Sequence, residues 1–342
     1  MEISQENVEQ LKELLAQKEG QKIAIIAHTN PDGDALGSTL AWSRIMRQMG
    51  HNPQCIAPNN YSYTMTWVEG IGDYIIFKTD AEHATKVVDE ADIIFCMDFN
   101  TTSRLEGLGE IVDKNRTAKR VLIDHHLNPD QNFDITFSYP AESSTCFVTY
   151  TLIEAIAGKE KIDKATANLL YMGIMTDTGN FSFAKLSPEL FRGVANLVEQ
   201  GAEIPRINRE IFQSYSVDRV KLFGFLINQK MKLIEDETVA YTSLYMKEMR
   251  QHNFQQGDSE GFVNYPLTAK KMKISALFTE HNKFIRTSFR SRENIDVNEF
   301  ARRYFNGGGH KNAAGGKSFA SMGETIETFK KAIAEYAAEG KL

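Results

Sequence analysis

The first half of the chain alternates short apolar runs with amphipathic stretches, which predicts a repeat of strands and helices. Runs rich in Val, Ile, Leu and Phe are expected from strands that are buried on both faces. They occur at residues 22–28, 52–58, 91–99 and 120–126. A helix is expected from about Ala35, directly after the first run. The pattern therefore predicts an α/β fold with a mostly parallel sheet flanked by helices.

The second half of the chain changes character. Residues 187–232 read as helix, and strand-like segments then resume at 231–245, 273–281 and 283–291, before a closing helix at 325–340. We therefore predict a catalytic domain at 1–190, a helical connector at 191–230 and a smaller α/β domain at 231–342.

Length and composition agree with two soluble domains. The chain has 342 residues, of which 42% are hydrophobic and 25% charged, and its N-terminal segment is an amphipathic polar helix without an apolar signal region. No run is apolar enough to span a bilayer. Cys55, Cys96 and Cys146 are widely spaced, as expected of structural thiols in a reducing compartment. We expect a cytoplasmic protein without a membrane partner.

The net charge of −6 argues against a protein that holds long nucleic acid on a general basic surface. No long duplex partner is therefore expected. The charge does not exclude a local cationic pocket.

Potential metal ligands gather in the segment HTNPDGDALGS, which follows the first strand. His28, Asp32 and Asp34 lie on one short loop, and Gly33 lets the two carboxylates address different ions. The alternative is a loop that only caps the following helix.

Further acids and imidazoles follow other apolar runs. Asp98 stands at the end of the third strand, where a carboxylate could bridge two ions, although it could also cap a turn. Residues 124–126 read DHH, and such a group is costly to bury without partners. Asp177 follows an apolar helical segment. A role in metal coordination and a role in the turn that ends the helix are equal alternatives for it.

This set contains carboxylates and imidazoles but no thiolate, which suits Mn²⁺, with Mg²⁺, Co²⁺ or Zn²⁺ as weaker alternatives. Two ions about 3.5–4 Å apart can hold a hydroxide nucleophile and polarise a phosphoryl oxygen. The sequence therefore predicts a two-metal phosphoesterase.

The C-terminal part carries candidate substrate groups. A glycine-rich turn, GGGH at residues 307–310, offers backbone amides to a phosphate. Arg286, Arg290 and Arg292 alternate along a strand and could clamp phosphate. The alternative for these arginines is a solvated strand edge.

Taken together, these motifs resemble the DHH/DHHA1 phosphoesterases, and within them the oligoribonuclease group called nanoRNase or pAp phosphatase. The likeness spans nearly the whole chain. It implies that His28, Asp32 and Asp98 hold one metal ion, that Asp34, Asp98, His125 and Asp177 hold the other, and that Asp98 bridges them. It also implies that His126 faces the scissile phosphate. Substrate contacts are implied for the C-terminal residues Arg290, Ser291, Arg292, Gly307, Gly308, Gly309 and His310.

The leading hypothesis is hydrolysis of very short RNA, such as the dinucleotides pApA and pGpG, with pAp 3′-phosphatase activity beside it. A cyclic-dinucleotide phosphodiesterase and an inorganic polyphosphatase or pyrophosphatase are rival enzymes that would use the same metals. A non-catalytic nucleotide-binding module is an alternative of another class. The sequence leaves open whether the chain forms a homodimer.

Overall fold

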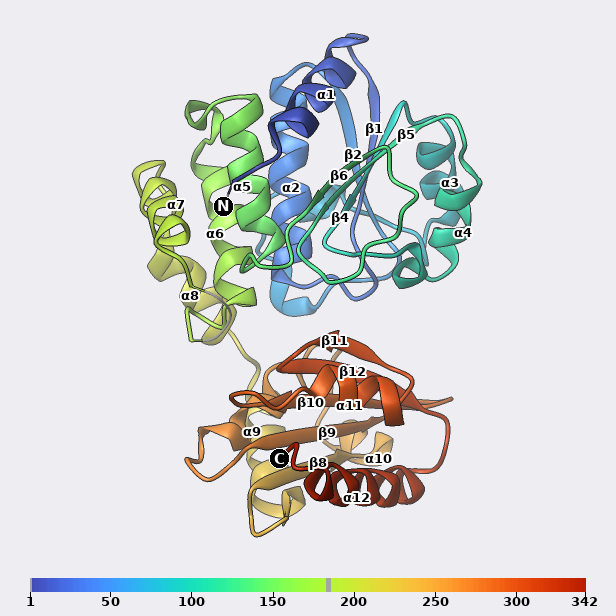
Figure 1. Ribbon diagram of the computed structural model, residues 1–342, viewed down its shortest axis with the longest axis vertical. Helices are drawn as coiled ribbons and strands as arrows, with labels where there is room; N and C mark the ends of the chain where they lie inside the picture. Colours follow the sequence, from blue (N-terminus) through green and yellow to red (C-terminus); the bar gives the residue numbers. More distant parts are fainter. Residues whose placement is uncertain (1, 183–185) are drawn as a thin grey trace. The chain divides into compact units, whose positions relative to one another are not determined.

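The computed structural model describes residues 2–182 and 186–342 and divides into two compact units, Met1–Ser214 and Tyr215–Leu342. Each unit is an α/β structure (Figure 1), so the predicted fold class is confirmed. The boundary between the units falls inside the segment 191–230, for which the sequence predicts a helical connector. The domain bounds themselves stay a prediction, and residues 1 and 183–185 of the first domain lie outside the described residues.

The N-terminal unit is built on a six-stranded sheet in which every pair of neighbours is parallel. Its spatial order is β3-β2-β1-β4-β5-β6. The strands are β1 (Lys22–Ile26), β2 (Asn52–Ala57), β3 (Ile75–Ile76), β4 (Ile93–Met97), β5 (Lys119–Asp124) and β6 (Ile135–Ser138). The four predicted strands are β1, β2, β4 and β5. The edge strands β3 and β6 are too short to give a clear apolar run.

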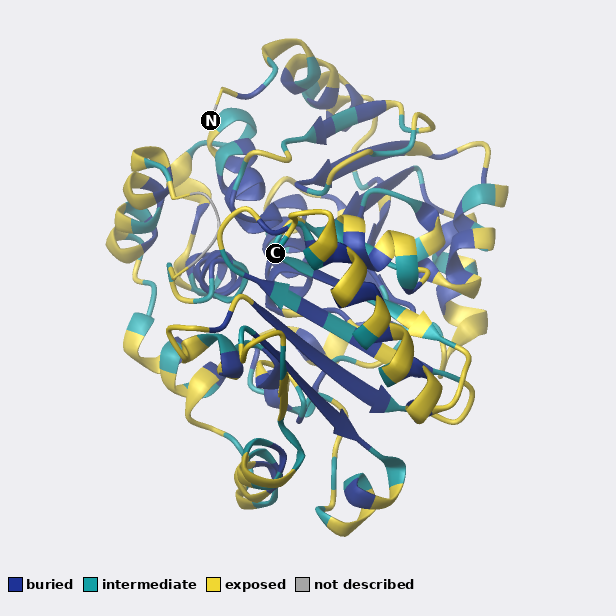
Figure 2. Cartoon of the chain, turned by 60° about the horizontal axis from the view of Figure 1, so that its bottom comes forward, coloured by how far each residue is buried: buried dark blue, intermediate teal, exposed yellow. Residues whose placement is uncertain are grey.

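Helices cover both faces of this sheet, and the last two helices of the unit pack on the outside of one helical layer (Figure 1). They are α1 (Gln5–Ala16), α2 (Gly33–Gln48), α3 (Ala81–Asp89), α4 (Gly107–Lys114), α5 (Thr145–Ile156), α6 (Lys164–Asp177), α7 (Pro188–Glu199) and α8 (Ile204–Phe212). Ile23 and Ile25 of β1 join the core under α1, α2, α5 and α6. Ala24 and Ile26 join a separate core under α3 and α4. The strands are therefore buried on both faces, as their dark colour in Figure 2 shows, which explains their continuous apolar runs.

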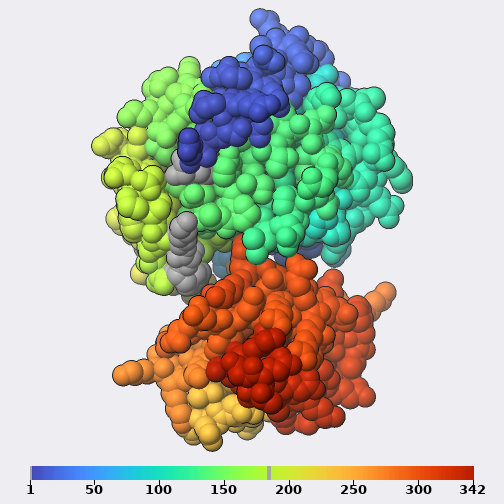
Figure 3. All heavy atoms as spheres, viewed as in Figure 1, coloured from blue at the N-terminus to red at the C-terminus, as the bar shows by residue number. Residues whose placement is uncertain are grey.

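Helix α1 lies on the surface of this unit (Figure 3). The Ser4 backbone amide donates to the Tyr139 hydroxyl at 2.9 Å, and the Asn7 side chain donates to the Thr136 carbonyl at 2.8 Å. These contacts cover the outer edge of β6, which would otherwise expose unpaired backbone groups.

Glycines set the distance between α2 and α6. A Cβ atom on Gly37 would lie 2.5 Å from the carbonyl oxygen of Leu169, and one on Gly173 would collide with the Cys146 sulfur. Only residues without a side chain allow this approach. It brings Asp34 at the start of α2 near Asp177 at the end of α6.

The C-terminal unit has a mixed six-stranded sheet with the order β11-β12-β10-β9-β8-β7, in which only β8 and β9 are parallel. The strands are β7 (Lys232–Ile234), β8 (Val239–Leu244), β9 (Ile274–Glu280), β10 (Ile285–Ser291), β11 (Gly308–His310) and β12 (Ala313–Ser318). The helices are α9 (Val217–Phe225), α10 (Met246–Gln251), α11 (Val297–Tyr304) and α12 (Met322–Ala338). Helices α11 and α12 pack on one face of the sheet through Phe300 and Phe329.

The glycine-rich segment near residue 308 differs from the predicted turn, because most of it forms the antiparallel strands β11 and β12. A Cβ atom on Gly309 would lie 2.5 Å from the Ala313 carbonyl oxygen. The glycines therefore serve close backbone pairing. None of the helices in the described residues is long and apolar enough to cross a membrane.

Replacing Gly37 with Ala should destabilise the N-terminal unit by about 1–3 kcal/mol, because the added methyl group forces α2 away from α6. The gain in helix propensity, about 1 kcal/mol, offsets only part of this loss. Chemical unfolding followed by circular dichroism measures the effect. Gly323→Ala on α12 is the control, since nothing lies within 4 Å of its Cβ position. Equal stability of Gly37→Ala and the parent protein would contradict the packing argument.

Candidate metal centre

The candidate centre lies where the strand order of the N-terminal sheet reverses. The chain runs outward from β1 through β2 to β3 and then returns to β4 on the other side of β1. Ligand sites of open α/β sheets form at such a point, beyond the carboxyl ends of the strands. His28 follows β1, Asp98 follows β4, and His125 follows β5.

The loop after β1 serves two purposes at once. One carboxylate oxygen of Asp32 accepts hydrogen bonds from the amides of Asp34 and Ala35, at 3.0 and 3.1 Å, and so caps α2. Asp32 also belongs, with His28 and Asp98, to a group whose ligand atoms lie within 4.8 Å of one another. Capping and metal binding are therefore compatible here.

Asp98 is the central carboxylate. Its backbone has φ +63°, a left-handed conformation that is uncommon outside glycine and clusters at functional sites. The side chain is 3% exposed, and it lies 3.4 Å from Nε2 of His28 and 3.7 Å from Nε2 of His125. The Thr145 hydroxyl donates to the same carboxylate at 2.8 Å.

A second group contains Asp34, His125 and Asp177, again within 4.8 Å. Nε2 of His125 lies 3.8 Å from Asp34 and 3.4 Å from Asp177. The two oxygens of Asp34 accept the backbone amides of Thr145 at 2.7 Å and Cys146 at 2.8 Å. The N-terminus of α5 therefore favours the charged form of Asp34, although burial and the neighbouring acids outweigh this effect.

The ring orientations of His28 and His125 fit metal binding. Nδ1 of His28 contacts the Thr29 carbonyl at 2.9 Å, and Nδ1 of His125 contacts the Glu142 carbonyl at 3.3 Å. A carbonyl oxygen only accepts, so the proton sits on Nδ1 and Nε2 points at the carboxylates. Such carbonyl partners commonly fix the ring of a ligand histidine.

His126 is held differently. Its Nδ1 lies 2.7 Å from Asp124, and its Nε2 lies 2.9 Å from Arg104. A guanidinium has only donors, so Nε2 accepts from Arg104 while Nδ1–H donates to Asp124. His126 is thus a neutral imidazole beside a cation in this arrangement.

Crowding of charge sets the electrostatics of the centre. Burial raises the pKa of Asp177 to about 7; the positive charge of His125 opposes this shift, whereas the carboxylates of Asp32 and Asp98 add to it. Burial and the neighbouring acids also raise the pKa of Asp34 well above its usual range. Burial alone would raise the pKa of Asp98, but the hydrogen bond from His28 and the charges of the histidines outweigh it and hold that pKa low.

The pKa values of the two histidines complete this picture. Burial lowers them, whereas the carboxylates raise them, and the net shift is upward for both His28 and His125. Raised pKa values on both acids and imidazoles mean that the cluster favours added positive charge. Divalent ions would supply that charge in place of protons.

Sequence reasoning missed three residues of the centre. Thr145 and Cys146 give their amides to Asp34, and the only signal was the Ser144 cap before an apolar helix. Arg104 carries no motif-like signal at all. All six sequence-predicted metal ligands are brought together, whereas their division between two ions stays a prediction.

The predicted substrate residues of the C-terminal unit do not form one cluster. Arg290 and His310 lie on the same face of the sheet, because each is in register with Ala313 of β12. Ser291 points to the opposite face and donates to the Ile295 carbonyl at 2.7 Å. Arg292 lies beyond β10 and donates to backbone carbonyls, including that of Leu267.

The glycines beside them already use their amides. Those of Gly307 and Gly309 donate to the Ala301 carbonyl at 3.2 Å and to the Asn298 side chain at 2.9 Å. The Gly308 amide belongs to the strand β11. The expected phosphate loop is therefore a strand in this structure.

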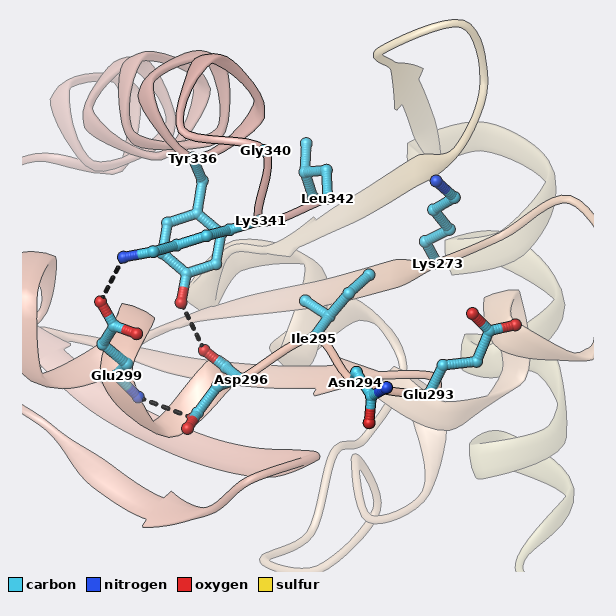
Figure 4. Close-up of a pocket in the computed structure, with 10 residues that line it drawn as sticks. All are labelled: Lys273, Glu293, Asn294, Ile295, Asp296, Glu299, Tyr336, Gly340, Lys341 and Leu342. Atoms are coloured by element: carbon cyan, nitrogen blue, oxygen red, sulfur yellow. Dashed lines mark hydrogen bonds and ion pairs between the residues drawn. The ribbon is translucent and has the colours of Figure 1, made fainter.

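The C-terminal unit also contains a cavity of about 370 Å³ (Figure 4). Its walls carry two lysines and three acids together with Tyr336, and Lys341 lies 2.6 Å from Glu299. None of the lining residues is a predicted ligand or substrate group. Because lysines and acids are mixed in its walls, this cavity is a poor site for an anionic substrate. The candidate catalytic residues lie in the N-terminal unit.

Comparisons with known proteins agree with this geometry. The sequence matches the DHH family, N-terminal domain, over residues 22–174 and the DHHA1 domain over residues 236–339. A crystal structure of an exopolyphosphatase-related protein from Bacteroides fragilis shares 33% identity and a TM-score of 0.92, and covers 98% of this chain and 97% of that chain. The chain belongs to the DHH/DHHA1 phosphoesterases. It is therefore a metal-dependent hydrolase of ester bonds.

Two curated relatives of this DHH/DHHA1 chain are named bifunctional oligoribonuclease and PAP phosphatase NrnA. The one from Mycoplasma genitalium is 28% identical and the one from Bacillus subtilis 26%; each alignment covers 87% of this chain and 89% and 90% of the relative. RecJ from Thermus thermophilus in complex with Mn²⁺ has a TM-score of 0.58 at 14% identity, over 99% of this chain and 55% of that one. That likeness shows the fold alone.

Divalent metal affinity of this DHH/DHHA1 protein should rise with pH. Metal ligands must be deprotonated, and the pKa of Asp177 is about 7 while those of His28 and His125 are raised. Each displaced proton makes binding about tenfold tighter per pH unit below its pKa. Calorimetric titration with Mn²⁺ between pH 6 and 8 should show the rise, together with proton release. A metal affinity that is constant over this pH range would show that the ion displaces no protons from these ligands.

Replacing Thr145 with Val keeps the side-chain shape but removes the hydroxyl that donates to Asp98. Loss of a group that orients a metal ligand typically weakens metal affinity by about 10–100-fold. We expect a loss in this range in Mn²⁺ titrations. Thr145→Ser retains the hydroxyl and should bind like the parent protein. If Val and Ser variants bind metal equally, the hydroxyl has no positioning role.

Proposed function

We propose that this DHH/DHHA1 protein uses two metal ions to hydrolyse short oligoribonucleotides, such as the dinucleotides pApA and pGpG, to mononucleotides. Cleavage of the 3′-phosphate of pAp at the same centre is part of the proposal. The observation that carries it is a pair of ligand groups that meet at Asp98, with His126 beside them. The two NrnA relatives, which align over most of the chain, support the choice of substrate.

His28, Asp32 and Asp98 would hold one ion, and Asp34, Asp98, His125 and Asp177 the other. Carboxylate and imidazole ligands without thiolate favour Mn²⁺, with Mg²⁺, Co²⁺ or Zn²⁺ as alternatives. Bound ions would polarise a phosphoryl oxygen and lower the pKa of a water nucleophile. Asp98 would serve both ions because its two oxygens face different histidines, Oδ2 toward His28 and Oδ1 toward His125.

His126 and Arg104 would meet the reacting phosphate. Arg104 supplies a fixed positive charge and planar donors, which suit phosphoryl oxygens. In the arrangement described, His126 Nε2 accepts a hydrogen bond, so the ring cannot donate a proton from that atom until Arg104 turns away. A phosphate that draws the guanidinium toward itself would free His126 to contact the substrate.

The DHHA1 unit would bind the rest of the substrate. Arg290 and His310, which share one face of its sheet, are the proposed contacts. The amides of Gly307 and Gly309 already have protein partners, and Ser291 and Arg292 are engaged with backbone carbonyls. Their proposed contribution is therefore the shape of this surface.

An inorganic polyphosphatase is the second candidate. The related Bacteroides fragilis structure is described as exopolyphosphatase-related, and the same two ions could cleave a phosphoanhydride. Free, buried thiols at Cys55, Cys96 and Cys146 support a cytoplasmic location for either activity.

Turnover of a substrate panel with Mn²⁺ tests the proposal. We expect rapid hydrolysis of pApA and pGpG, slower hydrolysis of longer RNA, and release of phosphate from pAp. Asp98→Asn should lower kcat by at least about a thousandfold, since it removes the charge shared by both ions. Preference for tripolyphosphate or cyclic di-AMP would replace the substrate assignment. Unchanged turnover by Asp98→Asn at normal metal content would show that the centre is not catalytic.

A further inference from the structure

The strands β10 and β12 bury one face, whereas their other face is partly exposed, most of all at Arg286 and Lys317. Ile285, Thr287 and Phe289 point to the core under α11 and α12. Side chains alternate along a strand, so Arg286, Ser288 and Arg290 point to the opposite face.

The strand register extends this partly exposed face sideways. Arg286 pairs with Lys317, and Ser288 pairs with Gly315. Arg290 pairs with Ala313, which in turn pairs with His310 of β11. Small residues therefore separate Arg290 from the Arg286–Lys317 pair, at a distance of about 13 Å along the strand. These residues form a strip with positive charge at both ends.

The pairing of Arg286 with Lys317 is unfavourable for folding. Like charges directly opposite on neighbouring strands destabilise a sheet. Within the described residues, no acidic side chain forms an ion pair with either of them, whereas Arg303, Lys330 and Lys341 of the same unit all pair with glutamates. The pair would gain a partner from a bound anion.

Two stacked aromatic rings adjoin this pair. The rings of His281 and Phe284 stack with their centroids 4.9 Å apart and an interplanar angle of 13°. Nζ of Lys317 lies 5.0 Å from the centre of the Phe284 ring. Burial lowers the pKa of His281, and the charges of Arg286 and Lys317 lower it further, so the imidazole is neutral at pH 7. Sites for single-stranded nucleic acid typically combine cations with exposed aromatic rings on which bases stack.

We propose that Arg286 and Lys317 bind a further phosphate of a single-stranded RNA longer than a dinucleotide, with a base stacked on the outer face of the exposed His281 ring. The dinucleotide itself would reach only the Arg290 end of the strip. The RNA identity of the ligand rests on the proposed function, whereas its negative charge rests on the Arg286–Lys317 pair alone. Such a position would let longer oligonucleotides bind more tightly than dinucleotides without changing the metal centre.

Binding by the full chain without metal tests this inference, because no hydrolysis can then interfere. Fluorescence anisotropy would follow labelled pApA, labelled pentaadenylate and, by competition, inorganic polyphosphate. The double variant Arg286→Gln/Lys317→Gln should bind pentaadenylate at least about fivefold more weakly and pApA as the parent protein does. Its salt slope, in log–log form, should fall by about 0.7 for each phosphate that the variant no longer neutralises. Lys330→Gln/Lys331→Gln on α12 is the charge-matched control. It should change neither the affinity for pentaadenylate nor its salt slope.

Unchanged pentaadenylate binding by the Arg286/Lys317 variant would overturn the inference. An equal loss for pApA would also overturn it, because the pair would then belong to the main binding position. His281→Leu separates the ligands: weaker pentaadenylate binding with unchanged polyphosphate binding supports RNA, whereas no effect on RNA rejects the stacked base. If the Mn²⁺ enzyme hydrolyses no RNA but the length-dependent binding remains, the proposed function fails and this site stands.

Discussion

The repulsion among four carboxylates at one edge of a sheet is the constraint on which the rest of the structure depends. Asp34 and Asp98 are buried, and Asp177 and the exposed Asp32 lie beside them, so this group is unfavourable unless positive charge or donors compensate. Burial, together with the charges of the neighbouring acids, raises the pKa values of Asp34 and Asp177, so without metal these groups tend to retain protons. Divalent ions replace these protons, so metal binding and protonation are alternative solutions to one problem.

The scaffold positions this charge with rigid parts. The N-terminus of α5 aims two amides at Asp34, and Thr145 connects the carboxylates of Asp34 and Asp98 through its amide and its hydroxyl. The glycine contact between α2 and α6 fixes the distance from Asp34 to Asp177. None of these groups needs to touch an ion, yet each sets where a ligand oxygen lies. Stability and metal affinity are therefore coupled in the N-terminal unit.

The sequence predicted the meeting of the candidate metal ligands but not the local structure of the glycine-rich segment, and the reason is physical. His28, Asp98 and His125 follow buried strands, and parallel strands end at one edge, so their meeting could be inferred from order alone. The contacts of Thr145 with Asp98 and of Arg104 with His126 join residues 47 and 22 positions apart, and no local pattern records them. Gly307 and Gly309 suggested a phosphate loop because strand pairing at glycine leaves the same local signal.

The net charge of −6 also has a different meaning once the centre is known. Two divalent ions would carry four positive charges and so would offset about two thirds of the formal net charge of −6. Much of the negative charge that would repel a polyanion thus lies on the metal ligands. Bound divalent ions would offset that charge. Away from the metal centre, the local arrangement of charged side chains decides whether phosphate binds. A strip with Arg290 at one end and Arg286 beside Lys317 at the other attracts phosphate whatever the total charge, because screening limits the influence of distant acids to about 8–10 Å.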